Sequence, residues 1–424
     1  MNLFVLFMCS VVKVFSPAPP ASGKGRGPTF GVSNGDEIWH DYAVLYIGVF
    51  MPFYREAISS ATVTLSRRDL TRMIRVVRTL YRLSRLEAYR QRILPQVPEA
   101  ARFNPGHDAV MMGYDFHLTP QGPRLIEVNT NAGGVLLAYL SHFPDSAAAR
   151  SRLPERLVEK VLTSFSEEMQ GLSRGSVKMP ETIAILDEEP EKQYLYQEMV
   201  AFVELFEKSG IRATIVDPGG LAADAGGVAA GGERIDLIYN RHCDFYLDGS
   251  EMSGIRAAYL AGNVCLTPNP FTYGLLADKR RLALWSDPEA LASFGLDAGE
   301  IEVLAGIVPE SRLLCDTDAE DIWRQRKDWV FKPVSRFGSR GVLLGRKISR
   351  TRFDELPPGE TLVQRHVPPS MTDVEGDEPM KTDLRLYVYR THVLGVAARL
   401  YHGQVTNLRT AGGGFAPVKV RAQL

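Results

Sequence analysis

Three oxygen-bearing side chains stand close together in the first third of the chain. Asp115 ends a strand-like run, and Glu127 and Asn129 stand two residues apart in the next one. A turn at 119–123 joins the two runs, so we expect a hairpin that brings the three residues together. Residues two apart on a strand share a face, and carboxylate and amide oxygens are ligands that Mg²⁺ prefers. The pattern therefore predicts a magnesium site.

Each of the three residues also has a purely structural explanation. Asp115 could cap a turn, while Glu127 and Asn129 could be polar residues on a solvated strand face. The interpretation as a metal site therefore depends on whether other parts of the chain supply the rest of a reaction centre.

Two lysines and a Gly-containing loop in the C-terminal part could bind phosphate groups. Lys332 ends a strand-like run and is followed by a loop from Ser335 to Gly341 that includes Gly338. Lys279 adds a second cation from a predicted helix at 278–285. Phosphates bind where positive charge meets backbone N–H groups on flexible turns. A single strand-ending lysine is more often a solvated charge, so the order of the elements carries this prediction.

The segment from Lys381 to Gly413 resembles ATP-grasp ligases, notably the ribosomal-protein glutamate ligase group. Its motifs are Asp383-Leu-Arg385, Arg399, Asn407 and Gly412-Gly413-Gly414. In that group a Gly-x-Asp strand and a Glu-x-Asn strand follow, and Gly113-Tyr-Asp115 and Glu127-Val-Asn129 look like them. Here these strands come first, an order similar to eukaryotic-type glutathione synthetases and glutathionylspermidine synthetases. The resemblance covers about residues 110–135 and 267–418, and it implies a circular permutation.

The resemblance implies a role for each matching residue. Lys279 and Lys332 would bind phosphates of ATP, the loop with Ser335, Gly338 and Gly341 would close over them, and the strand from Gln364 to Val367 would offer backbone groups to adenine. Asp115, Glu127 and Asn129 would hold one or two Mg²⁺ ions. Arg385 and Arg399 would offset charge on the transferred phosphoryl group, with Asn407, Gly412 and Gly413 beside the reacting carboxylate. The permuted glutathione synthetases have glutamate as the first metal ligand, whereas Asp115 follows the ribosomal-protein ligase pattern.

The remaining patterns divide the chain into segments. We expect a mixed α+β and α/β fold: a circularly permuted ATP-grasp fold, a small parallel-sheet α/β substrate domain and a helical N-terminal region. The expected boundaries are 1–28 for a tail or linker, 29–108 for the helical region, 109–150 for the permuted magnesium-binding part, 151–266 for the substrate domain and 267–424 for the main nucleotide-binding part. Asn240 and Arg241 end a predicted strand, where Arg241 could hold a substrate carboxylate or pair with Asp244.

A row of arginines marks the predicted N-terminal helices. Spacings of three and four residues place them on one helical stripe. The stripe could contact an anion or RNA, but a solvated face with packed alkyl stems is the more usual arrangement. The arginines are Arg68, Arg72, Arg75, Arg78, Arg82 and Arg85.

Composition excludes several classes of protein. The 424 residues carry a net charge of −1, which argues against a nucleic-acid-binding field over the whole surface. Four cysteines without a CxxC motif favour a reducing compartment, and we expect a cytoplasmic protein. The apolar run at 1–15 is shorter than the ~20 residues that span a bilayer, so no membrane partner is expected.

These observations together predict an ATP- and Mg²⁺-dependent carboxylate–amine ligase that acts through an acyl-phosphate. Its substrates would be a small-molecule acid and amine, peptides included. The alternatives are an ATP-grasp phosphotransferase and a nucleotide-binding protein without catalysis. Release of ADP that requires both an acid and an amine would distinguish the ligase. The sequence predicts neither the identity of the substrates nor the oligomeric state.

Overall fold

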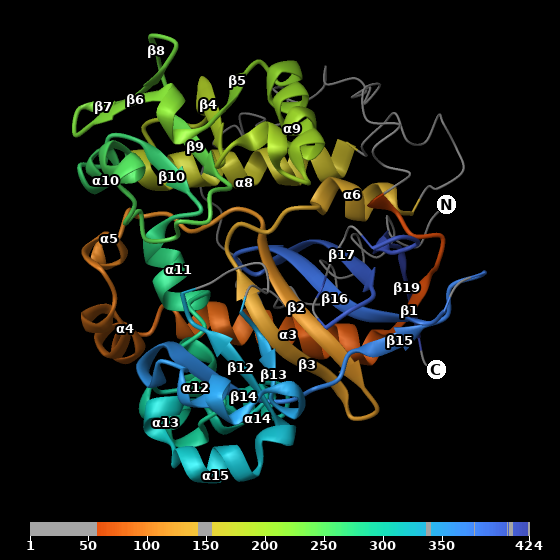
Figure 1. Ribbon diagram of the computed structural model, residues 1–424. Coiled ribbons are helices and arrows are strands. Elements are labelled where there is room, and N and C mark those ends of the chain that lie inside the picture. Colours follow the sequence, from red (N-terminus) through yellow and green to blue (C-terminus); the bar gives the residue numbers. More distant parts are fainter. Residues whose placement is uncertain are drawn as a thin grey trace, which may run out of the picture.

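The structure of the protein, a computed structural model, describes residues 57–142, 155–335, 341–376, 378–404, 406 and 410–422. Figure 1 shows three main sheets, with helices packed around each of them. None of the helices in these ranges is both long and apolar enough to cross a membrane. The predicted tail at 1–28, Gly338 and Asn407 lie outside the described residues.

The largest sheet has six strands. It combines two strands from the first third of the chain with four strands from its C-terminal part. Its order is β18 (Gly414–Ala416), β17 (His392–Tyr401), β16 (Met380–Tyr389), β2 (Met112–Thr119) and β3 (Gly122–Asn129), and β15 (Ser370–Thr372) also pairs with β16. The hairpin predicted around the turn at 119–123 is present as β2 and β3, and β16 and β17 form a second hairpin. Strand β16 pairs antiparallel with β2, which sets Arg385 directly opposite Asp115. Two motifs that lie 270 residues apart in the chain are therefore neighbours in one sheet.

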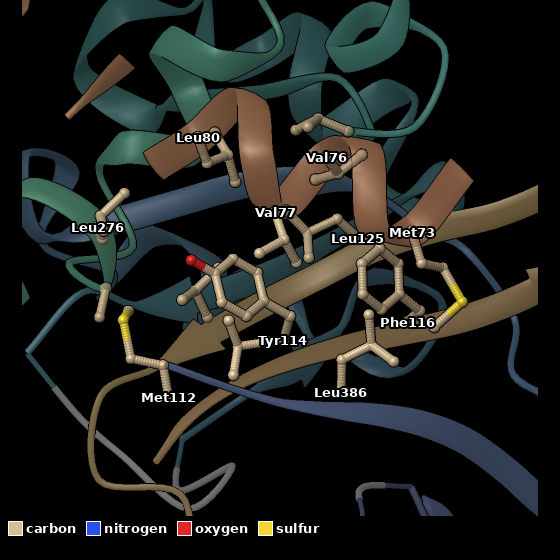
Figure 2. Close-up of a cluster of buried hydrophobic side chains, with 14 of the residues drawn as sticks. Met73, Val76, Val77, Leu80, Met112, Tyr114, Phe116, Leu125, Leu276 and Leu386 are labelled. Atoms are coloured by element: carbon tan, nitrogen blue, oxygen red, sulfur yellow. The ribbon is translucent and has the colours of Figure 1, made fainter. Parts of the chain in front are cut away.

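One face of this sheet packs against α3 (Arg67–Leu83). The helix begins at Ser66, whose side chain accepts a hydrogen bond from the amide of Asp69. Apolar residues recur every three or four positions on α3, and alternate residues of the strands meet them. Figure 2 shows this core, with Met73, Val76, Val77 and Leu80 of the helix against Tyr114, Phe116, Leu125 and Leu386 of the sheet. The other face of β2 and β3 is thereby left for polar groups.

A second, smaller antiparallel sheet has the order β11 (Ser311–Leu313), β14 (Thr361–Arg365), β12 (Trp329–Pro333) and β13 (Leu343–Leu344). Lys332 lies on β12, as predicted, whereas the strand predicted to reach Val367 ends at Arg365. The helices that precede or follow these strands are α11 (Pro270–Leu276), α12 (Arg281–Trp285), α13 (Pro288–Ser293), α14 (Ala298–Ala305), α15 (Ala319–Arg324) and α16 (Arg350–Asp354).

The third sheet is parallel, as predicted for the 151–266 segment. Its order is β10 (Cys265–Thr267), β9 (Leu237–Asn240), β4 (Thr182–Leu186) and β5 (Arg212–Val216). The helices of this segment are α8 (Glu155–Ser173), α9 (Tyr196–Lys208) and α10 (Ser253–Leu260). The glycine-rich stretch after β5 forms a small sheet of β6 (Leu221–Asp224), β7 (Gly227–Ala230) and β8 (Glu233–Arg234). Two-residue turns allow such hairpins at glycine-rich sites.

The N-terminal region is less uniformly helical than its arginine pattern suggests. It contains α3, α4 (Glu87–Ile93) and α5 (Glu99–Arg102), but also β1 (Val63–Ser66), which pairs in parallel with β19 (Val418–Arg421). A short helix, α6 (Val135–Leu140), follows the Asn131–Gly134 loop. A four-residue strand whose partner lies more than 350 residues away leaves little local pattern to detect.

Candidate functional site

A cavity of about 490 Å³ lies between the six-stranded sheet and the smaller antiparallel sheet. Six of its lining residues are Lys or Arg and three are Asp or Glu, so the cavity carries an excess of positive charge that suits a polyanionic ligand. The charged residues are Lys332, Arg346, Arg365, Lys381, Arg385, Arg399, Asp115, Glu127 and Asp383. Eight predicted site residues line it: Asp115, Glu127, Asn129, Lys332, Gln364, Val367, Arg385 and Arg399.

The three predicted oxygen ligands meet on the cavity face of β2 and β3. The side-chain amide of Asn129 donates to Asp115 Oδ2 at 3.2 Å and to Glu127 Oε1 at 3.1 Å. Asp115 lies within β2 rather than at its end. Among the described residues no three His, Cys, Asp or Glu side chains form a metal-binding group. The cluster here has two such side chains, and its third donor is the amide of Asn129. Two carboxylates and an amide in one hydrogen-bonded cluster suit a hard divalent cation.

A β-bulge gives these side chains their common face. Asp115 pairs with Glu127, but the next residue, Phe116, pairs with Leu125, so Ile126 is the extra residue. Without the bulge, Leu125 and Glu127 would point to the same face. With it, Leu125 packs in the α3 core and Glu127 lines the cavity. Simple alternation along 124–129 would therefore assign the wrong face on one side of Ile126.

The two arginines are fixed by a buried ion-pair network. Arg385 Nε and Nη2 donate to the two carboxylate oxygens of Asp115 at 2.6 and 2.7 Å. Arg399 donates from Nε to Asp383 at 2.6 Å and lies with Nη2 2.9 Å from Asp115. Asp383 also accepts from the Thr406 hydroxyl at 2.7 Å. Each guanidinium thus uses Nε and Nη2, and no hydrogen bond from either Nη1 is recorded among the described residues.

Charge in this network outweighs the effect of burial. Burial alone would raise the pKa of Asp115, but Arg385 and Arg399 hold that pKa at about 2. Burial would likewise lower the pKa of Arg399, and Asp115 and Asp383 raise it instead. Asp115, Arg385 and Arg399 therefore stay ionised across the physiological range.

Lys332 is a buried cation of the cavity. Its Nζ donates to the carbonyl of Ile126 at 3.1 Å, at the bulge. Burial lowers the pKa of Lys332 to about 8, with Glu127 opposing the change and Lys279 adding to it. Lys279, between α11 and α12, is thus close enough to influence Lys332, although it does not line the cavity.

The segment predicted to contact adenine lies along the cavity after β14. Gln364 donates from Nε2 to the Ser311 hydroxyl at 3.2 Å. The Val367 carbonyl, expected to be available to a ligand, already lies 2.8 Å from His117 Nδ1. His117 was not among the predicted site residues. Its position two residues after Asp115 on β2 was the signal that could have identified it.

Of the two predicted glycine loops, the first is described only at its ends and the second lies before β18. Ser335 follows β12 and Gly341 precedes β13, and neither lines the cavity. Gly412 and Gly413 precede β18, where the Gly412 carbonyl accepts from the Ser59 hydroxyl at 3.0 Å. An added Cβ at Gly413 would lie 2.5 Å from the Leu400 carbonyl oxygen, so close backbone packing alone accounts for that glycine.

Arg241 follows β9 at the carboxyl edge of the parallel sheet, where it is buried beside the Asn131–Gly134 loop. Its Nη1 lies 3.4 Å from Glu198, so its ion-pair partner is Glu198 and not Asp244. Its Nε is buried without a hydrogen-bond partner. Asn240 is occupied internally, because it accepts from the amide of His242 at 3.1 Å.

A carboxyl group next to Arg241 titrates unusually. Burial raises the pKa of Asp187 to about 6, although Arg241 opposes this. Asp187 directly follows β4, and Arg241 directly follows the adjacent strand β9. The carboxyl ends of the two strands therefore present a carboxyl group and a guanidinium group together. Such edges of parallel sheets are common ligand sites.

Comparison with known proteins shows the fold alone. No protein-family model matches the sequence, and no curated protein matches it. The structure is similar to that of a glutathione synthetase-like effector from Globodera pallida, with a TM-score of 0.54 and 10% identity over 86% of this chain and 90% of that one. A Methylobacillus flagellatus protein provisionally named gamma-glutamylcysteine synthetase gives a TM-score of 0.46 and 10% identity over 84% and 87% of the two chains.

Proposed function

We propose that this protein is an ATP- and Mg²⁺-dependent carboxylate–amine ligase with a circularly permuted ATP-grasp fold. The observation that carries the proposal is the convergence of oxygen donors, a buried lysine and two fixed arginines in one cavity between two antiparallel sheets. The fold it shares with a glutathione synthetase-like effector supports the same class of protein. The pairing of β16 with β2 supports the permuted order of the motifs.

The nucleotide would lie between the two sheets. Lys332 and Lys279 would bind its phosphates, and the segment from Gln364 to Val367 would contact the base. Asp115, Glu127 and Asn129 would hold Mg²⁺, which when bound would offset the negative charge of the phosphate oxygens. Ser335, Gly338 and Gly341 would cover the phosphates, and Asn407, Gly412 and Gly413 would lie towards the acid substrate.

The reaction would proceed in two displacements. A carboxylate oxygen of the acid substrate attacks the γ-phosphorus of ATP, and ADP leaves. The amine nitrogen then attacks the acyl carbon, phosphate leaves and the nitrogen loses a proton. The Nη1 groups of Arg385 and Arg399 would stabilise the charge on the phosphoryl oxygens. Because Asp115 and Asp383 already hold both guanidinium groups, little reorganisation is needed during the reaction.

Calorimetry of ATP binding with and without Mg²⁺ tests the nucleotide site, and an ADP-release screen over acids and amines tests the reaction. The ligase predicts binding that Mg²⁺ strengthens and ADP release that needs both an acid and an amine. Release with an acceptor but no amine would identify a phosphotransferase instead. Absence of ATP binding would reject the proposal.

Nucleotide affinity should depend on the charge of Lys332. With a pKa of about 8, the lysine is mostly charged at pH 7 and mostly neutral at pH 9. If only the charged form binds phosphate, the Kd for ATP should rise about tenfold between these pH values. Calorimetry across the range measures this. Lys332→Arg, which stays charged, should bind with little change over the same pH range, and an equal rise in that variant would contradict the explanation.

The acid substrate should depend on Arg241. We propose that Arg241 holds its carboxylate, because a buried guanidinium with an unpartnered Nε lies beside the loop that follows Asn129. Arg241→Ala should raise the KM for the acid by about 10–100-fold and leave the KM for ATP nearly unchanged. Arg234→Ala, an exposed arginine on β8, is the matched control. An unchanged acid KM in Arg241→Ala would reject this role.

A further inference from the structure

The arginine stripe on α3 divides into two parts that differ in their partners. Towards the C-terminal end, Arg82 forms an ion pair with Glu300, and Arg85 lies 2.8 Å from Asp108. Towards the N-terminal end, Arg67, Arg68 and Arg75 are exposed, and no ion pair of theirs is recorded in the described part of the chain. The exposed arginines of the second part agree with the solvated face that the sequence favoured, whereas Arg82 and Arg85 form ion pairs.

This N-terminal part lines a groove of about 810 Å³, and among the groove arginines Arg72 alone has an ion-pair partner in the described chain, Asp69 at 3.7 Å. Four arginines, Arg67, Arg68, Arg72 and Arg75, form one wall, and the β2–β3 turn and the end of α14 complete it. Because α3 packs on one face of the six-stranded sheet and the nucleotide-type cavity lies on the other, the groove is separate from the candidate active site (Figures 1 and 2).

The wall of the groove is held in place. Arg72 Nη1 donates to the carbonyl of Gln121 at 2.9 Å, in the β2–β3 turn. The next residue, Gly122, has φ +105°, and an added Cβ there would overlap the Arg72 guanidinium. Burial, with the charge of Arg72 adding to it, lowers the pKa of the neighbouring Arg124. Asp69 offsets part of the charge of Arg72, but the like charges of the neighbouring arginines remain, and an anion would relieve their repulsion.

The other lining residues favour a protein segment over a nucleic acid. Val303 provides partly exposed apolar surface beside the arginines, and Glu302 adds one negative charge to the lining. The described residues that line the groove include no aromatic side chain on which a base could stack. An acidic peptide with interspersed apolar side chains complements both the arginines and Val303.

We propose that this groove is a docking site for an acidic, extended segment of a partner protein. The binding is distinct from the proposed ligase reaction and does not occupy its cavity. Its contacts are exposed ion pairs, so the affinity is modest and decreases as salt is added.

The test measures fluorescence anisotropy of a labelled ten-residue oligoglutamate peptide with the full chain. Saturable binding at 50 mM salt should weaken at 300 mM salt. It should also weaken about tenfold in Arg67→Ala/Arg68→Ala/Arg75→Ala. The control Arg212→Ala/Arg324→Ala/Arg352→Ala removes three exposed arginines elsewhere and should bind like the unmodified protein.

Three results would overturn the proposal. They are the absence of saturable peptide binding at low salt, an equal loss of affinity in the control variant, and tighter binding of a ten-nucleotide oligothymidylate than of the peptide. The single charge reversal Arg75→Glu provides a second variant and should also weaken peptide binding. Circular dichroism of each variant verifies that the fold is retained.

Discussion

Glu127→Ala/Asn129→Ala should abolish the strengthening of ATP binding by Mg²⁺ and reduce acid- and amine-dependent ADP release by about 10²–10³-fold. The physical reason is the compactness of the donor cluster. Asn129 lies within hydrogen-bonding distance of both Glu127 and Asp115, so the three side chains can surround one ion. In the double variant Asp115 would be the one ligand left. Because its oxygens also pair with Arg385 and Arg399, it cannot replace the two missing donors.

The measurement is calorimetry with ATP in the presence of Mg²⁺ and of a chelator. The variant should bind ATP equally in both conditions, at the affinity that the unmodified protein shows with the chelator. Glu355→Ala/Gln91→Ala removes the same two kinds of side chain from exposed positions and should retain the full Mg²⁺ effect. If the double variant retained it too, the cation would bind elsewhere and the proposed metal site would be wrong.

The sequence predicted the local parts of this site well. Hairpin 112–129 has a short turn and alternating residues, so its existence depends on neighbours in the chain. The same is true of β12 with Lys332 and of the parallel sheet around β4 and β9, where strands alternate with helices. Local periodicity is enough for such elements because their hydrogen bonds and their buried faces repeat at a fixed spacing.

The nonlocal parts were not predictable in the same way. The ion pairs of Asp115 with Arg385 and Arg399 follow from the register of β16 on β2 and of β17 on β16, which no local pattern specifies. The bulge at Ile126 puts Leu125 and Glu127 on opposite faces of the sheet, whereas simple alternation would put them on the same face. Asp383 belonged to a recognised motif, but its role as the carboxylate that holds Arg399 required knowledge of the strand opposite.

A second network, remote from the cavity, should control stability. Glu168 on α8 is fully buried and accepts hydrogen bonds from four groups at 2.8–3.1 Å. The four donors come from three places in the chain: the His107 ring and the adjacent Asp108 amide, the Thr267 hydroxyl and the Tyr389 hydroxyl. One carboxylate therefore joins α8, β10, β16 and the segment before β2.

Glu168→Gln should lower the free energy of unfolding by about 3–5 kcal/mol. The amide keeps the shape of the carboxylate, but its NH₂ group cannot accept, so buried donors lose their partner. It also leaves the charged ring of His107 without its counter-ion. Chemical denaturation at pH 7 measures the change. Glu167→Gln is the matched control on the same helix, since Glu167 is 39% exposed and pairs with Arg390 at the surface, and it should cost at most about 1 kcal/mol.

The pH dependence of stability offers an independent check on this network. Burial lowers the pKa of His107, but Cys265 and Glu168 outweigh it and raise the pKa well above 6.5. A raised pKa in the folded state means that the stabilisation is fully present below pH 6.5 and is lost as pH rises through the folded-state value. The unmodified protein should therefore lose stability over that range, and Glu168→Gln should lose less, because the charge that favours the protonated ring is absent. A parallel decline in both proteins would show that His107 and Glu168 do not form the ion pair on which the predicted stability loss depends.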